Sequence, residues 1–218
     1  MGFWNTVQKL QDKTLPMCSM VVAAAGSSAR MGGQDKLFTY LAGAPVLMRT
    51  LCAIDRAELV SEIVVAVQAD RMEAVAELCA RCALRKKVRV VKGGASRTES
   101  VLAAALECDP KAELIAIHDG ARPLVRPEMI DEMIRAGYRT QAVAPAIPVT
   151  DTVKVADDSG LVQSTPDRSS LYAVQTPQVF QANILKAALQ AALASGEPVT
   201  DDCAAVERLG KQVWLVEG

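Results

Sequence analysis

The chain has 218 residues, of which 50% are hydrophobic and 4% aromatic, and this apolar content excludes an intrinsically disordered protein. Lys and Arg number 24 against 25 Asp and Glu, and the formal net charge of −1 argues against a general binder of nucleic acid or anionic membranes. The sequence holds no apolar run near the roughly 18 residues that span a bilayer. We therefore expect neither nucleic acid nor a membrane among its partners.

The cysteines predict a reducing compartment. Six of them are scattered along the chain without the spacing of a small secreted domain. Cys79 and Cys82 form a CxxC pair within a helical pattern, which we interpret as buried structural thiols rather than a zinc or redox site. Residues 17–26 have the length of a short signal peptide, but the residues that follow favour a buried first strand. We expect a cytoplasmic protein.

Strand-like and helix-like segments alternate along the chain. Residues 1–16 are interpreted as an N-terminal extension, followed by a single domain over 17–218. Strands are expected at 20–25, 63–67, 88–91, 114–117 and 142–147. Helices are expected at 45–59, 70–84, 96–108 and 127–138. This alternation predicts a Rossmann-like α/β fold, with a mostly parallel sheet covered by helices on both faces.

The alternation breaks at residues 152–164. Two short β-like runs flank a turn at 157–160 and predict an inserted hairpin. Its apolar side chains, Val153, Val155, Leu161 and Val162, need a partner surface. We therefore favour a dimerisation arm, over about 149–172, above a solvated flap.

The loop after the first strand, residues 24–36, carries the clearest chemistry, because parallel sheets bind ligands at the carboxyl ends of their strands. Gly26 allows a tight turn that presents N–H groups to a phosphate chain. Arg30 and Lys36 then supply fixed positive charge around it. The loop matches neither a P-loop nor a GxGxxG fingerprint. The alternative is a glycine-rich surface turn with two solvated cations.

The stretch AAAGSSARMGGQDK resembles the signature loop of the sugar-phosphate nucleotidyltransferases, most closely the 2-C-methyl-D-erythritol 4-phosphate cytidylyltransferases. Later stretches resemble the same family: GGASRTESV at 93–101, HDGARP at 118–123, the segments 144–154, 166–169 and 175–180, and TDD at 200–202. The resemblance runs from about residue 19 to 218. It implies transfer of a cytidylyl group from CTP to methylerythritol phosphate in non-mevalonate isoprenoid synthesis, with release of pyrophosphate, Mg²⁺ as cofactor and a homodimer formed through the arm.

The resemblance also assigns residues. It implies catalytic roles for Arg30, Lys36 and Arg168. It places nucleotide binding at Ala24, Ala25, Gly26, Ser27, Gly93, Gly94, Arg97, Ser100, Asp119, Ala121 and Arg122, with Asp119 near the magnesium ion. It places substrate binding at Thr150, Asp151, Thr152, Arg168 and Thr200, with Arg168 donated into the neighbouring subunit's site.

Several of these residues also fit a purely structural role. Ser96 and Glu99 fit a capping box at the start of the 96–108 helix. His118, the single histidine of the chain, is interpreted as orienting its loop rather than as an acid–base catalyst.

Charged side chains in the same stretches can have structural roles as well. Arg122 can pair with Asp119, and Arg168 with Asp167. The two acids at 201 and 202 can cap a helix over 202–209. Ala95 stands where the family often carries Asp, so a base contact from that side chain is missing.

The implied nucleophile is a phosphate that is already ionised at neutral pH, so catalysis needs positioning and charge neutralisation rather than a general base. Three different functions stay open. One is ribitol-5-phosphate cytidylyltransferase, whose loops are almost the same, and another is a different nucleotidyltransferase. The third is a catalytically impaired CTP-binding protein, because the sequence ends at Gly218, before a family segment with a further substrate-facing lysine.

Overall fold

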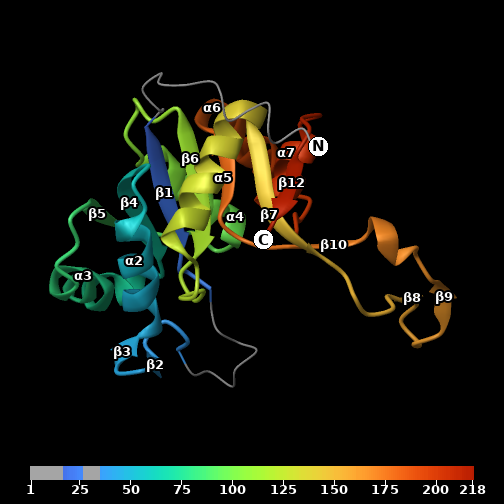
Figure 1. Ribbon diagram of the computed structural model, residues 1–218, viewed down its shortest axis with the longest axis horizontal. Coiled ribbons are helices and arrows are strands. Elements are labelled where there is room, and N and C mark those ends of the chain that lie inside the picture. Colours follow the sequence, from blue (N-terminus) through green and yellow to red (C-terminus); the bar gives the residue numbers. More distant parts are fainter. Residues whose placement is uncertain (1–16, 27–34) are drawn as a thin grey trace.

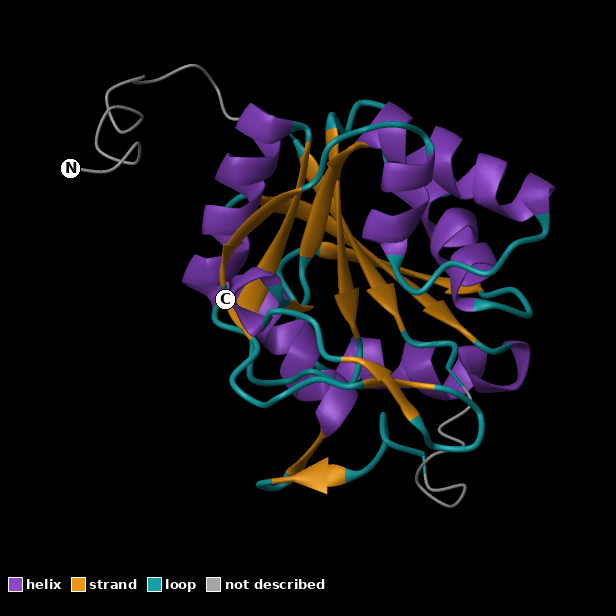
Figure 2. Cartoon of the chain, turned by 90° about the vertical axis from the view of Figure 1, so that its right-hand side faces the viewer, coloured by secondary structure: helices purple, strands orange, loops and turns teal. Residues whose placement is uncertain are grey.

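The computed structural model describes residues 17–26 and 35–218, which form a mixed eight-stranded sheet between two layers of helices (Figures 1 and 2). The strands of this sheet are β1 (Cys18–Ala23), β4 (Val60–Val67), β5 (Lys87–Lys92), β6 (Leu114–Asp119), β7 (Ala142–Pro148), β10 (Tyr172–Val174), β11 (Gln178–Gln181) and β12 (Trp214–Glu217). The α-helices are α2 (Val46–Arg56), α3 (Met72–Arg81), α4 (Arg97–Leu106), α5 (Pro127–Thr140), α6 (Ala182–Ser195) and α7 (Asp202–Arg208). Shorter elements are β2 (Tyr40–Leu41), β3 (Ala44–Pro45), β8 (Val155–Ala156), β9 (Val162–Ser164) and the 3-10 turns η2 (Ala69–Arg71) and η3 (Arg168–Ser170).

The strand order reverses its direction beside β1. Neighbouring strands run β10-β7-β11-β6-β1-β4-β5, with β12 also beside β7. β1, β4, β5 and β6 are parallel, and β11 is antiparallel between β6 and β7. The chain moves outward from β1 through β4 to β5 and then returns to β6 on the other side of β1. In open α/β sheets, ligands bind beyond the carboxyl ends of the strands near such a switch point.

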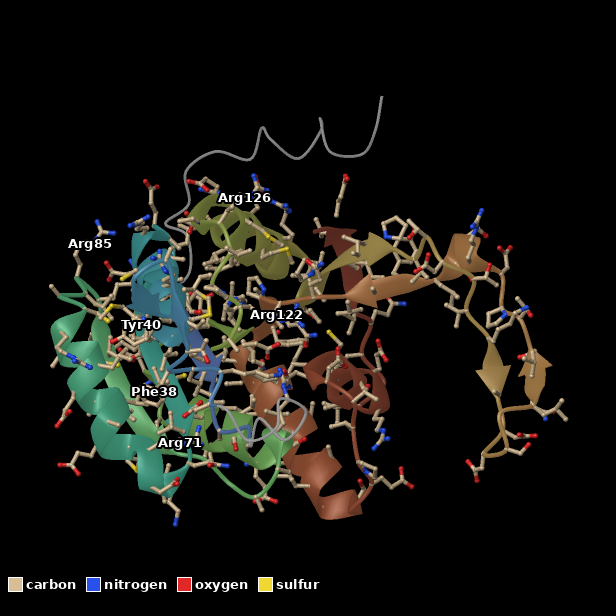
Figure 3. All side chains as sticks on the ribbon, turned by 90° about the horizontal axis from the view of Figure 1, so that it is seen from below. Phe38, Tyr40, Arg71, Arg85, Arg122 and Arg126 are labelled. Atoms are coloured by element: carbon tan, nitrogen blue, oxygen red, sulfur yellow. The ribbon has the colours of Figure 1, made fainter. Side chains whose placement is uncertain are left out.

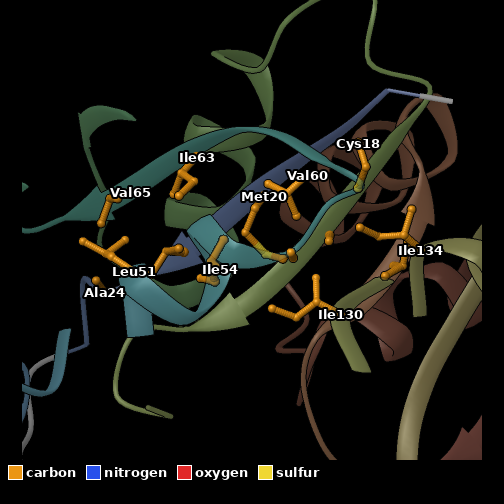
Figure 4. Close-up of a cluster of buried hydrophobic side chains, with 14 of the residues drawn as sticks. Cys18, Met20, Ala24, Leu51, Ile54, Val60, Ile63, Val65, Ile130 and Ile134 are labelled. Atoms are coloured by element: carbon orange, nitrogen blue, oxygen red, sulfur yellow. The ribbon is translucent and has the colours of Figure 1, made fainter. Parts of the chain in front are cut away.

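Each layer of helices is fixed by an apolar face. On one side α2, α3 and α5 bury side chains such as Leu51, Ile54 and Ile130 against Met20 and Val65 (Figure 4). On the other side α4, α6 and α7 pack on the opposite face of the same strands. Removing this apolar surface from water is the dominant favourable term in folding. The predicted α/β class, with helices on both faces, is confirmed.

The predicted strands and helices are all present, with boundaries that differ by a few residues. The expected 70–84 helix divides into η2 and α3. β10, β11, β12 and α6 have no counterpart among the elements predicted from the sequence. β11 is only four residues long and leads directly into α6, so its alternation is too short to be recognised.

The hairpin predicted at 152–164 is confirmed, because β8 pairs with β9 in the antiparallel direction. The Asp157 carboxylate closes its turn by accepting hydrogen bonds from Ser159 and from Leu161 N–H at 3.1 Å. The segment projects away from the body of the molecule (Figure 1). All four apolar side chains singled out from the sequence are exposed, with Leu161 at 65% and Val162 at 51%. The division into an extension at 1–16 and a domain at 17–218 stays a prediction, since 1–16 lie outside the described residues.

Candidate active site

Three loops meet at the carboxyl ends of the parallel strands. The first follows β1 and holds Ala24, Ala25 and Gly26. A Cβ atom placed on Gly93, in the loop after β5, would lie 2.7 Å from the Cβ of Ala25, so only glycine permits this approach. The N–H of Gly120, in the loop after β6, donates to the carbonyl of Ala23 at 2.9 Å. The predicted nucleotide-binding loops therefore lie together.

The position of its neighbour Leu37 places the Lys36 backbone near these loops. Leu37 is 5% exposed, and its carbonyl accepts from Leu47 N–H at 3.0 Å. A Cβ on Gly120 would lie 3.3 Å from Leu37 Cδ2, which places the Lys36 segment against the loop after β6. Ser27 and Arg30, which were also predicted in this loop, lie outside the described residues.

A network of charges crosses the site. Arg97, the first residue of α4, places Nη1 2.6 Å from Asp202 Oδ2 and Nη2 3.6 Å from Asp119 Oδ1. The second oxygen of Asp119 accepts from Arg122 Nε at 2.8 Å. The Asp119–Arg122 pair considered from the sequence is confirmed. Asp119 is partly exposed, and Ala121 and Arg122 are exposed, so the Asp119–Arg122 side of the network faces solvent.

Asp202 is the buried member of the network. It is 1% exposed, and burial raises its pKa although the Arg97 charge opposes this. Burial alone would lower the pKa of Arg97, but the nearby Asp202 and Asp119 charges outweigh it and raise the pKa. The expectation that both acids cap α7 is confirmed only for Asp201, whose Oδ1 accepts from Ala204 N–H at 2.9 Å. Asp202 instead neutralises Arg97, a role that its place in the sequence does not indicate.

The loop after β5 is shaped by its own side chains. Ser96 caps α4 by accepting from Glu99 N–H at 3.1 Å, and Glu99 Oε2 accepts from Ala95 N–H at 2.9 Å. Ser100 is 2% exposed; its hydroxyl donates to the Ser96 carbonyl at 2.8 Å and accepts from Gly94 N–H at 3.1 Å. Ser100 therefore holds the Gly93–Gly94 backbone in place, and its role in nucleotide binding stays a prediction.

His118 orients its loop, as predicted from the sequence. It is 1% exposed, with Nδ1 2.9 Å from Thr176 Oγ1 and Nε2 3.1 Å from the Arg122 carbonyl. A carbonyl only accepts, so Nε2 carries the proton and Nδ1 accepts from the threonine hydroxyl. Burial lowers the pKa of His118 below its ordinary value of 6.5. The ring is neutral and both its nitrogens are engaged within the protein.

Substituting His118 with Gln tests this arrangement. A lowered pKa means that the unfolded chain binds more protons near pH 6.5, so the stabilisation by the neutral ring is lost as pH falls below that value. We expect His118→Gln to reduce the free energy of unfolding by about 1–2 kcal/mol at pH 7.5. We expect a smaller reduction at pH 5. Urea denaturation of both proteins at the two pH values measures the difference, and an equal reduction at both would contradict a neutral buried ring.

The predicted substrate-binding residues do not gather around the three loops. Thr150, Asp151, Thr152 and Arg168 are exposed on the projecting arm (Figure 1). Arg168 Nη1 donates to the Thr150 carbonyl at 3.1 Å. The alternative pairing of Arg168 with Asp167 is wrong, since Asp167 accepts from Ser169 N–H instead. Thr200, next to the Asp201 cap, lies at the body of the molecule and is exposed.

Comparison with known proteins identifies the family. The IspD family model, described as 2-C-methyl-D-erythritol 4-phosphate cytidylyltransferase, matches residues 18–218. The chain belongs to the 2-C-methyl-D-erythritol 4-phosphate cytidylyltransferase family. The family enzyme of Caldanaerobacter subterraneus is 43% identical over 202 residues, which cover 92% of this chain and 89% of that enzyme. The enzyme of Symbiobacterium thermophilum is 42% identical over 92% of this chain and 84% of its own length.

A solved structure supports membership of the same family. The crystal structure of 4-diphosphocytidyl-2C-methyl-D-erythritol synthase from Anaerococcus prevotii superposes with a TM-score of 0.83 and 31% identity, covering 93% of this chain and 87% of that one. The cytidylyltransferase family predicted from the loops is thereby confirmed. The chain is a CTP-dependent nucleotidyltransferase that acts on methylerythritol phosphate in isoprenoid synthesis, and the three competing functions are not favoured.

Within the ranges that the structure describes, no helix is long and apolar enough to cross a membrane. The same ranges contain no group of three or more His, Cys, Asp or Glu side chains placed to hold a metal ion.

Proposed function

We propose that this chain transfers the cytidylyl group with the residues that converge after β1, β5 and β6. The observation that carries the proposal is the contact of the three loops around Asp119, with Arg97, Arg122 and the Lys36 segment beside it. Main-chain groups of residues 24–26 and 93–94 bind CTP. The cations offset negative charge as the phosphate of the substrate attacks the α-phosphorus and pyrophosphate leaves.

The donor set fits the proposed Mg²⁺. Mg²⁺ in nucleotide enzymes is held by one or two carboxylates together with substrate phosphates, and it keeps several waters. Asp119 offers one such carboxylate: Oδ2 is bonded to Arg122, while Oδ1 lies 3.6 Å from Arg97 and is only loosely engaged. When bound, Mg²⁺ would neutralise charge on the triphosphate. Asp119 is therefore the residue that we propose as its protein ligand.

The arm is proposed to complete the site of a second subunit. Apolar side chains on both strands of the arm are exposed: Val155 in β8 is 47% and Val162 in β9 is 51% exposed. The adjoining end of the sheet exposes Ile147, Tyr172, Val174, Trp214 and Leu215. Burying this apolar surface against a second copy favours a homodimer. In that dimer Arg168, with Thr150, Asp151 and Thr152, contacts the methylerythritol phosphate bound by the partner, and Thr200 contacts it from within the same chain.

The cytoplasm is the proposed compartment. All six cysteines are free thiols, and burial raises the pKa of Cys79 to about 11 and of Cys82 to about 12. Thiols are kept reduced in the cytoplasm.

The reaction is tested by pyrophosphate release from CTP and Mg²⁺, measured in parallel with methylerythritol phosphate and with ribitol 5-phosphate. We expect turnover with the first substrate only, and loss of turnover when Mg²⁺ is removed with a chelator. Turnover with ribitol 5-phosphate alone, or equal turnover without a divalent ion, would contradict the proposal.

Mixing two inactive variants tests the arm. We expect Arg168→Ala and Lys36→Ala each to be nearly inactive, because each removes one cation from every site. Random exchange of subunits makes half of the dimers mixed, and each mixed dimer has one intact site, so the mixture should regain about a quarter of the wild-type activity. Pyrophosphate release before and after subunit exchange measures this, with each variant alone as the control. No recovery in a mixture shown to exchange would argue that Arg168 serves its own chain.

A further inference from the structure

Arg71 connects the carboxyl end of β4 to the loop that carries Lys36. It is the last residue of η2, the turn that follows β4. Its Nη1 forms an ion pair with Oδ2 of Asp35, the residue before Lys36. The two side chains are each only 23% exposed. Asp35 belongs to the signature-like stretch 23–36, whereas Arg71 lies 36 positions away and in no motif, so the sequence does not indicate that the two residues pair.

Asp35 in turn organises the segment around Lys36. Its Oδ1 accepts from Leu37 N–H at 3.1 Å, and its carbonyl accepts from Phe38 N–H at 3.2 Å and from Thr39 N–H at 3.1 Å. An aspartate that bonds the backbone two residues on fixes a turn. Leu37 is anchored in the core on the other side. The backbone of Lys36 is therefore held between a residue tied to Arg71 and a residue buried among apolar side chains.

The location of Arg71 agrees with a role at the site. Arg71 follows the carboxyl end of β4, and β4 is parallel to β1, so Arg71 lies at the same edge of the sheet as the loop after β1. Figure 3 shows Arg71 and Phe38 near each other on one side of the molecule. The guanidinium of Arg71 is directed at Asp35, so it influences the reaction through the position of the Lys36 backbone. Catalytic groups displaced by about 1 Å can lose on the order of 10²-fold in rate, so a tether of this kind affects turnover more than folding.

We infer that Arg71 is a positioning residue for cytidylyl transfer, which acts by holding Asp35 and thereby the backbone of Lys36. The inference rests on the role proposed for Lys36. It adds Arg71 and Asp35 to the residues on which the rate depends.

The test separates kcat from KM. We expect Arg71→Ala to lower kcat about tenfold while the KM for CTP changes less than about twofold, and Arg71→Lys to recover part of the loss. Arg81→Ala, which removes an exposed arginine from the end of α3, is the matched control and should leave kcat unchanged. An unchanged kcat in Arg71→Ala, or a loss that falls on KM alone, overturns the inference.

Two further variants keep the result interpretable. Asp35→Asn retains an oxygen for Leu37 N–H but removes the ion pair, and it should reproduce the loss in kcat without disturbing the turn. Adding Arg71→Ala to Lys36→Ala should cause no further loss, because there is no longer a lysine to position. A further tenfold loss in that double variant overturns the inference while leaving the role of Lys36 intact. Normal turnover of Lys36→Ala by itself would instead refute the proposed function of that residue.

Discussion

Lys36→Ala is expected to lower kcat by about 10²–10³-fold while CTP affinity changes less than about threefold. The proposed reaction has a nucleophile that is already ionised, so its rate depends on cations that stabilise charge developing at phosphorus. A group that acts only in the transition state affects kcat and not ground-state binding. The measurement is steady-state pyrophosphate release together with CTP titration by calorimetry.

Lys111 provides the control for this experiment. It is an exposed lysine just before β6, at the end of the sheet opposite the three loops, and Lys111→Ala should retain wild-type turnover. Lys36→Arg keeps the charge with a different shape and should retain part of the activity. Normal turnover of Lys36→Ala would remove this residue from the mechanism. A loss confined to CTP affinity would make it a binding residue only.

The second large effect concerns the buried carboxylate of Asp202. Arg97→Ala is expected to reduce the free energy of unfolding by about 3 kcal/mol at pH 7.5, because it leaves that carboxylate without its counter-charge. Burial already raises the pKa of Asp202, and loss of Arg97 raises it further. An acid with a raised pKa binds its proton more tightly in the folded state, so this deficit shrinks as pH falls. Urea denaturation at pH 5 and at pH 7.5 measures it.

Two variants check the cause of that effect. Asp202→Asn in the Arg97→Ala background removes the buried charge and should restore part of the lost stability at pH 7.5. Arg208→Ala breaks an exposed ion pair with Glu197, at 3.7 Å, and should cost less than about 1 kcal/mol. A deficit for Arg97→Ala that is the same at both pH values, and is not relieved by the asparagine, would show that Asp202 is not the origin.

Local patterns in the sequence explain most of the parallel sheet. The run 63–67 is continuous and β-branched, as expected for a strand that is covered on both faces, and it lies within β4. Pro127 begins α5, where its missing N–H costs nothing. The loops after β1, β5 and β6 were also predictable, because glycines and charged residues follow apolar runs there.

Some features depend on segments that meet only in the folded chain. β11 is inserted between β6 and β7 in the antiparallel direction, and this depends on pairing with both neighbours rather than on its own four residues. The capping of α7 was predictable for Asp201. Asp202 looks equally suited to a cap, and only the packing of the folded chain, which brings α7 within reach of Arg97, turns it into the partner of that arginine.

The sequence by itself determined the fold class, the family and the loops that form the site, because each of these is encoded within stretches of about ten residues. The tertiary structure decided which charged side chains form ion pairs. Arg97 meets Asp202 across 105 positions, and Arg71 meets Asp35 across 36. It also made His118 a neutral, bonded ring. Burial and pairing set the behaviour of an ionisable group, and both depend on which strand ends the topology brings together.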